Sequence, residues 1–255
     1  MFQIYKSAGL KAALLAGCMI SMFASCKKHQ REEVFPASLT VVNGLNDQTS
    51  FLTAYFGEGQ PRIYARLAYI GNGAAFEYGT DKTEQPVRLY RNHDTLHIDK
   101  PFVQSRLQLE PGSIYTHFVY GAPAAVKQKT VKDQIPSRSA QDSVANLRFI
   151  NLFENRAIDV VQLEPEARTM ASNLAYEQLT DFMKVPVTAS VQQFRFELKD
   201  HATGATLATL TEANLFPGTT LPNVAWLFKA RTMVITGTWT GAGNFSARAT
   251  TIGHY

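Results

Sequence analysis

Apolar and polar residues alternate in short runs through most of the chain after residue 36, and sustained helical periodicity is scarce. The runs are rich in β-branched and aromatic residues, which favour strands. Turn signals such as Asn43-Gly44 and Pro111-Gly112 separate them at intervals of about ten residues. Strands of this size and spacing predict an all-β fold, a sandwich or a barrel. In the first half the predicted strands are 38–43, 51–56, 62–70, 86–90, 95–98, 106–109 and 114–120.

The second half continues the same pattern. Phe194, Phe196 and Leu198 alternate with Arg195 and Glu197, as a sheet with one buried and one solvated face requires. Neither half offers the helices that would connect the strands of a parallel sheet. Predicted strands in this half are 146–151, 157–163, 191–198, 206–210, 225–228, 232–239 and 245–251.

The two halves also repeat one another. The segment Ser38-Leu39-Thr40-Val41-Val42-Asn43 parallels Asn146-Leu147-Arg148-Phe149-Ile150-Asn151, and each ends in an asparagine that opens a loop. Further along, Arg66-Leu67-Ala68-Tyr69 matches Asn173-Leu174-Ala175-Tyr176. Order and approximate spacing are kept, which favours a tandem duplication.

Residues 127–143 interrupt the strand pattern with lysines, serines, glutamines and Pro136. Such a polar segment buries little apolar surface, so it is predicted to be a linker or long exposed loop. The chain therefore divides into five predicted parts. They are a signal peptide at 1–25, a polar tether at 26–36, β-sandwich domain 1 at 37–126, the linker at 127–143 and β-sandwich domain 2 at 144–255.

The signal peptide is predicted from the pattern at the start of the chain. Lys6 and Lys11 give a basic start, Ala12 to Ser25 is apolar and small, and Cys26 is followed at once by charged residues. The apolar stretch is about 14 residues, which suits a signal peptide and is short of the roughly 20 that a spanning helix needs.

The residues before Cys26 resemble the bacterial lipobox. Ala24 and Ser25 match it, whereas Phe23 stands where leucine is usual. A rival box ending in Cys18 matches more closely but leaves only about six apolar residues after Lys11, too few for a signal core. We predict cleavage before Cys26 and lipid attachment to it, with a plain secretory signal as the alternative. Acyl chains on Cys26 would then hold the protein to a membrane leaflet.

This placement predicts a lipid-anchored protein of the cell envelope, on the outer membrane, with the periplasmic face or the cell surface left open. The formal net charge is +4, and loss of Lys6 and Lys11 with the signal leaves +2, so nothing indicates a nucleic-acid partner. One cysteine would remain, and it would be acylated. The mature chain then has no disulfide and no cysteine-based metal site, and its stability must come from hydrophobic cores.

The repeated asparagine strands, the Leu-Ala-Tyr segments and the strand Ile158-Asp159-Val160 resemble DUF4397 domains, as does Leu109-Glu110-Pro111-Gly112-Ser113-Ile114-Tyr115-Thr116-His117-Phe118-Val119-Tyr120-Gly121. The resemblance covers about residues 37–125 and 145–252. Such domains occur in envelope lipoproteins of the Bacteroidetes, where Ser-Cys-Lys-Lys anchors are frequent. The resemblance implies tandem Ig-like β-sandwich domains, the second copy divergent, with no established activity and no catalytic residues.

Motifs of catalysis and cofactor binding are scarce. The sequence contains no nucleophile elbow, zinc-binding helix motif, P-loop or EF-hand loop. Gly71-Asn72-Gly73 begins like a dinucleotide fingerprint, but Phe76 stands in place of the third glycine and no helix pattern follows. We interpret it as a hairpin turn, and we predict no cofactor, no bound metal and no catalytic residue.

Three histidines and two acidic pairs remain as candidates. His93 and His97 are predicted on a turn and strand, where four residues separate them by about 13 Å, too far for one metal ion. His117 is predicted to point outward or to be hydrogen-bonded, because no acid is identifiable as its orienting partner. The acidic pairs that could be considered for glycoside hydrolysis are Asp94 with Asp99 and Glu164 with Glu166.

Aromatic side chains are better binding candidates, since sugars and extended peptides stack on rings and sandwich loops often present them. We nevertheless interpret most of them as residues that fill the two cores, Trp226 in particular, because it lies within the apolar run 224–228. The available rings are Tyr64, Tyr69, Tyr78, Tyr90, Trp226 and Trp239.

The sequence thus predicts a lipid-anchored cell-envelope protein with a non-catalytic binding or structural role. Its ligand would be a polysaccharide or an envelope protein. The alternative is a carbohydrate-active enzyme or accessory factor of a glycan-uptake system, which needs two carboxylates roughly 5–10 Å apart in a concave site. A third reading is an adhesin or pilus-related subunit with an open sheet edge.

Overall fold

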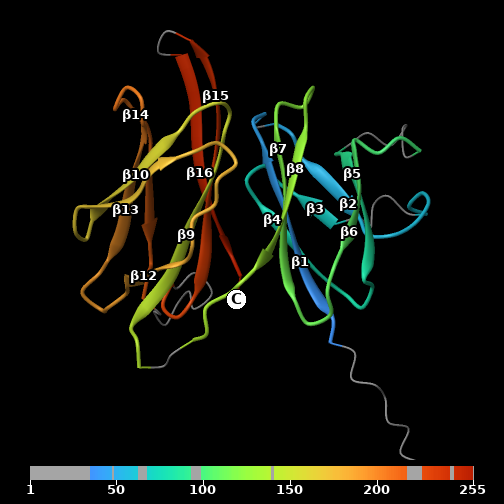
Figure 1. Ribbon diagram of the computed structural model, residues 1–255, viewed down its shortest axis with the longest axis horizontal. Coiled ribbons are helices and arrows are strands. Elements are labelled where there is room, and N and C mark those ends of the chain that lie inside the picture. The colour runs from blue at the N-terminus through green and yellow to red at the C-terminus, as the bar shows by residue number, and fades with distance from the viewer. Residues whose placement is uncertain are drawn as a thin grey trace, which may run out of the picture. The chain divides into compact units, whose positions relative to one another are not determined.

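The computed structural model describes residues 35–47, 49–62, 68–92, 99–138, 141–216, 226–241 and 244–254. The predicted signal peptide, Cys26, nearly all of the tether, His93, His97, Asp94 and Tyr64 lie outside the described residues. Residues Phe35 to Tyr255 form one compact unit. Its described part contains sixteen β-strands and no helix (Figure 1). No segment within it is therefore a helix able to cross a membrane.

The first eight strands form two four-stranded sheets. Sheet A has the order β4-β1-β7-β8, and sheet B has the order β3-β2-β5-β6. The strands of sheet A are β1 (Ala37–Leu45), β4 (Ala75–Thr80), β7 (Ile114–Gly121) and β8 (Lys127–Asp133). Those of sheet B are β2 (Leu52–Tyr55), β3 (Ala68–Ile70), β5 (Glu84–Arg91) and β6 (Val103–Gln108).

The last eight strands repeat this topology. Sheet C has the order β12-β9-β15-β16 and sheet D the order β11-β10-β13-β14, which is sheets A and B with each strand number raised by eight. The strands of sheet C are β9 (Val144–Phe153), β12 (Met183–Pro186), β15 (Ala230–Gly241) and β16 (Asn244–Gly253). Those of sheet D are β10 (Ile158–Glu164), β11 (Arg168–Leu174), β13 (Gln193–Asp200) and β14 (Thr206–Ala213).

The predicted all-β fold of two sandwich units is therefore confirmed. We call β1–β8 the first sandwich and β9–β16 the second. In each, the first strand pairs in parallel with the seventh, β1 with β7 and β9 with β15, and every other strand pair is antiparallel.

The predicted strand 225–228 is wrong in its described part, because residues 226–229 form a turn in which the Lys229 N–H donates to the Trp226 carbonyl at 2.9 Å. The predicted hairpin turn at residues 71–73 is wrong as well, because it connects β3 of sheet B to β4 of sheet A.

Two further details of the sequence interpretation are also wrong. Residues 127–133 are not linker but the edge strand β8, which pairs with β7. Backbone pairing needs no apolar side chains at a sheet edge, and lysines there discourage further strands from adding. The second error is the match of Arg66–Tyr69 with Asn173–Tyr176. Leu174 pairs with the first residue of β10 as Ile70 pairs with the first residue of β2, so Leu174 corresponds to Ile70.

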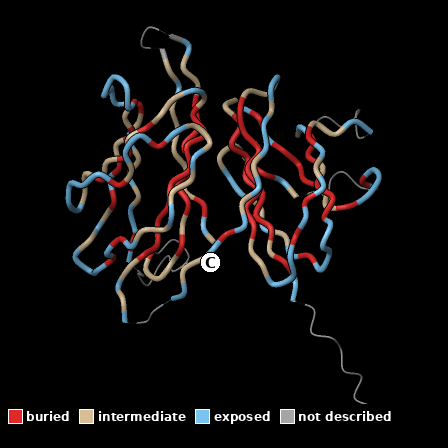
Figure 2. The backbone as a smooth tube through the Cα atoms, viewed as in Figure 1, coloured by how far each residue is buried: buried red, intermediate tan, exposed pale blue. Residues whose placement is uncertain are grey.

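Each sandwich has its own core between its two sheets, and a third apolar cluster lies between sheets A and C. Leu39 and Val41 of β1 point into the first core, whereas Val42 belongs to the third cluster. The central strands of sheets A and C are consequently buried on both faces, as the long red stretches of Figure 2 show. The third cluster contains Val42, Phe118, Tyr120, Ile150, Leu152, Val234 and Ile252.

Candidate binding cleft

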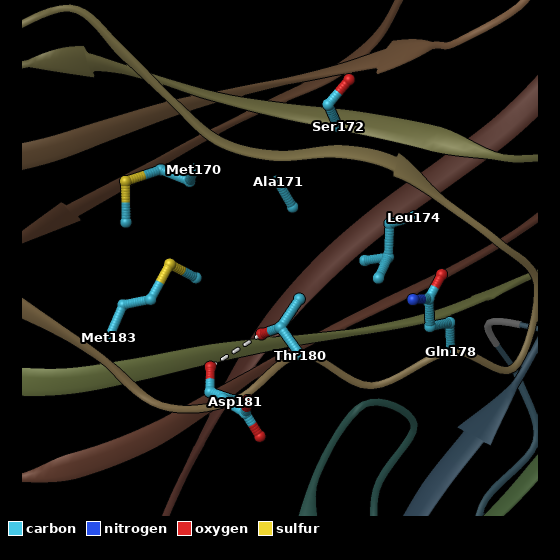
Figure 3. Close-up of a pocket in the computed structure, with 8 residues that line it drawn as sticks. All are labelled: Met170, Ala171, Ser172, Leu174, Gln178, Thr180, Asp181 and Met183. Carbon is cyan, nitrogen blue, oxygen red and sulfur yellow. Dashed lines mark hydrogen bonds between the residues drawn. The ribbon is translucent and has the colours of Figure 1, made fainter.

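A cleft of about 280 Å³ lies in the second sandwich, between β11 and β12 (Figure 3). These two strands are the edges of sheets D and C on the same side of the sandwich, and residues 175–182 connect them. The two sheet edges are not joined by backbone pairing there, which leaves room between them. The cleft is lined by Met170, Ala171, Ser172, Leu174, Gln178, Thr180, Asp181 and Met183.

The deeper wall of the cleft is apolar. Met170 and Leu174 are buried, Met183 is half-buried, and Figure 3 shows the two methionine side chains on the same side of the cleft. Methionine is flexible and polarisable, so such a wall adapts to the shape of a ligand and favours contact with aromatic rings.

The rim is polar, and two of its side chains are fixed by hydrogen bonds. The Gln178 Oε1 atom accepts a hydrogen bond from the Ala175 N–H at 2.8 Å. The Thr180 hydroxyl accepts one from the Phe149 N–H at 3.0 Å and donates one to the Asp181 carbonyl at 3.0 Å. The Thr180 side chain thus ties the rim to β9, the strand next to β12.

Asp181 is the one carboxylate in the lining, and it is exposed. Among the described residues, no lysine, arginine or histidine lies within 4.0 Å of its oxygens. A glycoside hydrolase needs two carboxylates in one concave site. The cleft provides an apolar surface and one negative charge, which is the chemistry of binding.

The acidic residues singled out in the sequence lie elsewhere. Glu164 accepts a hydrogen bond from Gln193 and forms an exposed ion pair with Arg195 at 3.3 Å. Glu166 is exposed in the turn between β10 and β11, where its carbonyl accepts from the Gln162 amide. Neither carboxylate lines the cleft.

Two of the five described aromatic candidates belong to the cores. Tyr90 and Trp226 are buried, and Trp226 packs against Phe194 at 5.3 Å between ring centroids. Trp239 is half-buried, with the Arg156 guanidinium 4.0 Å from its ring centroid. The interpretation of these rings as core therefore holds for Tyr90 and Trp226.

Tyr69 and Tyr78 behave differently. Tyr69 is 53% exposed and stacks on the exposed ring of Phe51 at 5.4 Å. Tyr78 is half-buried and stacks on Phe56 at 4.0 Å, with the ring planes 5° apart. Of the described candidates, Tyr69 is thus the ring that remains accessible to a ligand.

His117 is buried in the first sandwich, and its Nδ1 lies 2.8 Å from the Thr130 hydroxyl. The prediction of a hydrogen-bonded histidine is confirmed. Burial lowers the pKa of His117 to about 4, although the Gln128 side chain acts in the opposite direction. The imidazole is therefore neutral at neutral pH, and the residue is only 1% exposed.

Sequence reasoning missed a buried polar cluster between the sandwiches. The Arg148 Nη2 atom donates to the Asp133 carboxylate at 2.5 Å, and its Nε donates to the Thr232 hydroxyl at 2.8 Å. The other Asp133 oxygen accepts from the Thr116 hydroxyl at 2.6 Å. His254 lies beside them, with its Nε2 2.6 Å from Thr232 Oγ1 and its Nδ1 4.0 Å from Asp133 Oδ2. The signal in the sequence is a single arginine inside the apolar strand of residues 147–153.

This cluster ties the sandwiches together. Burial and the nearby Arg148 charge lower the pKa of His254 to about 4, while Asp133 acts in the opposite direction. The Phe182 ring packs edge-on against His254 and lies beneath the Arg148 guanidinium at 4.5 Å. Across the described part of the chain, no group of three or more His, Cys, Asp or Glu residues could hold a metal ion.

No protein-family model matches the sequence, and no curated protein matches it. Two solved structures from Porphyromonas gingivalis align with most of it. The tip fimbrial protein Mfa3 with C-terminal truncation is 10% identical, and the alignment covers 86% of this chain and 99% of that chain at a TM-score of 0.26. The fimbrial anchor protein Mfa2 is 8% identical, with coverage of 86% and 98% and a TM-score of 0.28. These scores are too low to assign a shared function.

Proposed function

We propose that the protein is a lipid-anchored, non-catalytic component of the bacterial cell envelope that binds a partner through the cleft between β11 and β12. The observation that carries the proposal is the lining of this cleft, an apolar methionine wall with a polar rim and a single carboxylate. Pockets of this composition bind by apolar contact and are oriented by a few polar groups.

The anchor is the second part of the proposal. A basic start, about 14 apolar residues and a cysteine followed by Lys27 and Lys28 support a signal peptide that ends at Cys26. Acylation of Cys26 would hold the sandwiches at a membrane leaflet. The outer membrane is the proposed location.

Metabolic labelling tests the anchor. The full chain is expressed in a bacterium of the Bacteroidetes with labelled palmitate, beside Cys26→Ser and Cys18→Ser variants. We expect label in the wild type and in Cys18→Ser, and none in Cys26→Ser. Label that persists in Cys26→Ser, or its absence from the wild type, would contradict the anchor.

Catalysis is tested separately. The purified full chain in detergent is incubated with a panel of envelope polysaccharides, and new reducing ends are measured with a fungal glycosidase as positive control. We expect no release above the buffer blank. Release of reducing ends at a rate proportional to protein concentration would contradict the non-catalytic role and favour the carbohydrate-active alternative.

A further inference from the structure

Next to the cleft, the residue pairing in the second sandwich follows that in the first. Residues of the two sandwiches can therefore be matched by their pairing partners. Val42 of β1 pairs with Ala75, and Ile150 of β9 bridges to Leu179. One residue further along, Phe76 pairs with Val41. In the second sandwich, the Thr180 N–H correspondingly donates to the Phe149 carbonyl at 2.9 Å. Thr180 therefore occupies the place that Phe76 has in the first sandwich.

The next inward-facing position gives the same result. Tyr78 pairs with Leu39 of β1, and Met183 pairs with Leu147 of β9. Leu39 and Leu147 occupy the same place in the repeated strands. The second sandwich has one extra residue between its two positions. Met183 thus takes the place of Tyr78, and both Thr180 and Met183 line the cleft.

The third position lies on the opposite sheet. Ala54 of β2 pairs with Leu89, and Val160 of β10 pairs with Leu198. Phe56 follows Ala54 by two residues, as Gln162 follows Val160. Gln162 is buried and uses its amide on the Glu166 carbonyl. Gln162 thus corresponds to Phe56, so the second sandwich has no aromatic ring at this position either.

In the first sandwich these three positions form one aromatic stack. Phe56 lies between two rings, with centroid distances of 4.0 Å to Tyr78 and 5.9 Å to Phe76. The rings close the side of the sandwich next to β4. In the second sandwich, Thr180 and Met183 replace two of these rings and line the cleft, which is open at that side. Gln162, at the place of the third ring, is not part of the cleft lining. The cleft is thus the space that aromatic rings fill in the other copy of the fold.

We propose that the cleft receives an aromatic side chain of a partner polypeptide, with a lysine or arginine next to it in the partner. This proposal rests on the binding role proposed above and names the group that is bound. The volume of about 280 Å³ is near the lower end of the roughly 300–1,000 Å³ of ligand sites and is enough for one aromatic side chain. The sulfurs of Met170 and Met183 provide favourable contacts for a ring.

The basic neighbour follows from the charge at the rim. Asp181 is exposed, belongs to the lining and has no cationic partner among the described residues. The nearest basic side chain in sequence, Lys184, is paired with Asp142 at 2.7 Å. A cation beside the bound ring would therefore meet a free carboxylate. An exposed pair of this kind strengthens binding about threefold.

The test uses the full chain in detergent with ¹³C-methyl methionine, observed by NMR. The probes are three acetylated dipeptide amides: lysine–tyrosine, glutamate–tyrosine and lysine–leucine. We expect lysine–tyrosine to shift the Met170 and Met183 methyl signals with a dissociation constant on the order of 1 mM. Glutamate–tyrosine should bind about threefold more weakly, and lysine–leucine should leave both signals in place. Met233, which is buried in the core, is the internal reference.

Exchanging residues between the two copies provides the control variants. The double variant Thr180→Phe with Met183→Tyr restores two of the rings and should abolish binding. If the double variant does not fold, the single variant Thr180→Phe should abolish binding. The reverse exchange, Phe56→Gln with Phe76→Thr and Tyr78→Met, should create a second site and leave the first intact. Glu77→Gln, an exposed change on the same strand, should alter nothing.

The proposal is overturned if lysine–leucine binds as well as lysine–tyrosine, or if the folded Thr180→Phe variant keeps full binding. It is also overturned if no probe shifts Met170 or Met183 at 20 mM. A loss of palmitate label from the wild type would contradict the anchor and leave this result unaffected. The two proposals therefore fail separately.

Discussion

Asn43 and Asn151 occupy the same position in the two sandwiches and make the same set of hydrogen bonds. The Asn43 side-chain amide donates to the carbonyls of Ser50 and Ile70, at 2.8 and 3.3 Å. Its Oδ1 accepts from the Leu45 N–H at 3.3 Å. One buried side chain thus joins the end of β1 to the start of β2 and the end of β3.

Asn151 repeats each contact in the second sandwich. Its amide donates to the carbonyls of Arg156 and Leu174 at 2.6 and 2.8 Å, and its Oδ1 accepts from the Phe153 N–H at 2.9 Å. These bonds reach the start of β10 and the end of β11. Both asparagines are fully buried, so each satisfies backbone groups that have no access to water.

Replacing either asparagine with alanine should destabilise the protein. Asn151→Ala removes a side-chain partner from one buried carbonyl, one half-buried carbonyl and one buried N–H, at a cost of about 2–4 kcal/mol in the free energy of unfolding. Urea denaturation followed by tryptophan fluorescence measures it. Asn43→Ala should cost a similar amount, and Gln104→Ala, at an exposed position, should stay within about 0.5 kcal/mol of the wild type. Equal stability of the Asn151→Ala and Gln104→Ala variants would refute this role.

The position of these two asparagines at the ends of repeated strands is also the feature of the fold that the sequence predicts most clearly. The repeat was recognised from strands that end in Asn43 and Asn151, and the structure places both side chains in the same role. The Leu-Ala-Tyr match was misaligned because three similar letters carry less information than a buried hydrogen-bonded position. The polar strand β8 was missed because its pairing depends on backbone groups, which every sequence provides.

The packing of sheet A against sheet C is not predicted, because the strand prediction relies on alternating apolar and polar residues. Strict alternation describes a strand with one wet face, as in β13. Val41-Val42, Phe149-Ile150 and Leu152-Phe153 instead place apolar residues side by side, which is typical of strands buried on both faces. The cleft could not be predicted at all. It depends on the register of two edge strands, which no local pattern specifies.

Breaking the buried ion pair between the sandwiches should be costly. Arg148→Met leaves the Asp133 carboxylate buried without its cation, and we expect a loss of about 3–5 kcal/mol in unfolding free energy. Replacing both residues, Arg148→Met with Asp133→Leu, should cost less than the sum of the single changes. A double-mutant cycle in urea measures the coupling.

A surface pair provides the matched control for that cycle. Lys184 and Asp142 lie 2.7 Å apart with side chains that are 66% and 41% exposed. Lys184→Met should change stability by at most about 1 kcal/mol, because water screens the charges. If Arg148→Met is no more harmful than Lys184→Met, the buried pair does not hold the sandwiches together.

Gly237 in β15 should tolerate no side chain. A Cβ atom there would lie 2.2 Å from the Ser246 carbonyl oxygen and 2.5 Å from the Phe153 ring, so backbone would have to move. We expect Gly237→Ala to lower the free energy of unfolding by about 1–3 kcal/mol. Gly79→Ala, where a Cβ meets nothing within 4 Å, is the control and should be near neutral in the same thermal and urea experiments. A neutral Gly237→Ala would show that β15 and β16 approach less closely here.

Acid should destabilise the protein through the two buried histidines of its described part, before the carboxylates titrate. The pKa values of His117 and His254 are lowered from 6.5 to about 4, mainly by burial. The unfolded chain therefore binds more protons than the folded one below pH 6.5, and stability falls as the pH decreases from about 6.5 to 4. Each histidine accounts for a loss of up to about 3 kcal/mol, which is complete below pH 4.

Urea denaturation at pH 7, 6, 5 and 4 measures this slope. His254→Gln removes one titrating group, so its stability should change roughly half as steeply between pH 6.5 and 4.5 as that of the wild type. Gln104→Ala, which changes an exposed residue that does not titrate, is the control and should keep the wild-type slope in this interval. An unchanged slope in His254→Gln would mean that folding does not lower the pKa of His254. The account of the cluster as an ion pair beside an imidazole kept neutral by burial would then be wrong.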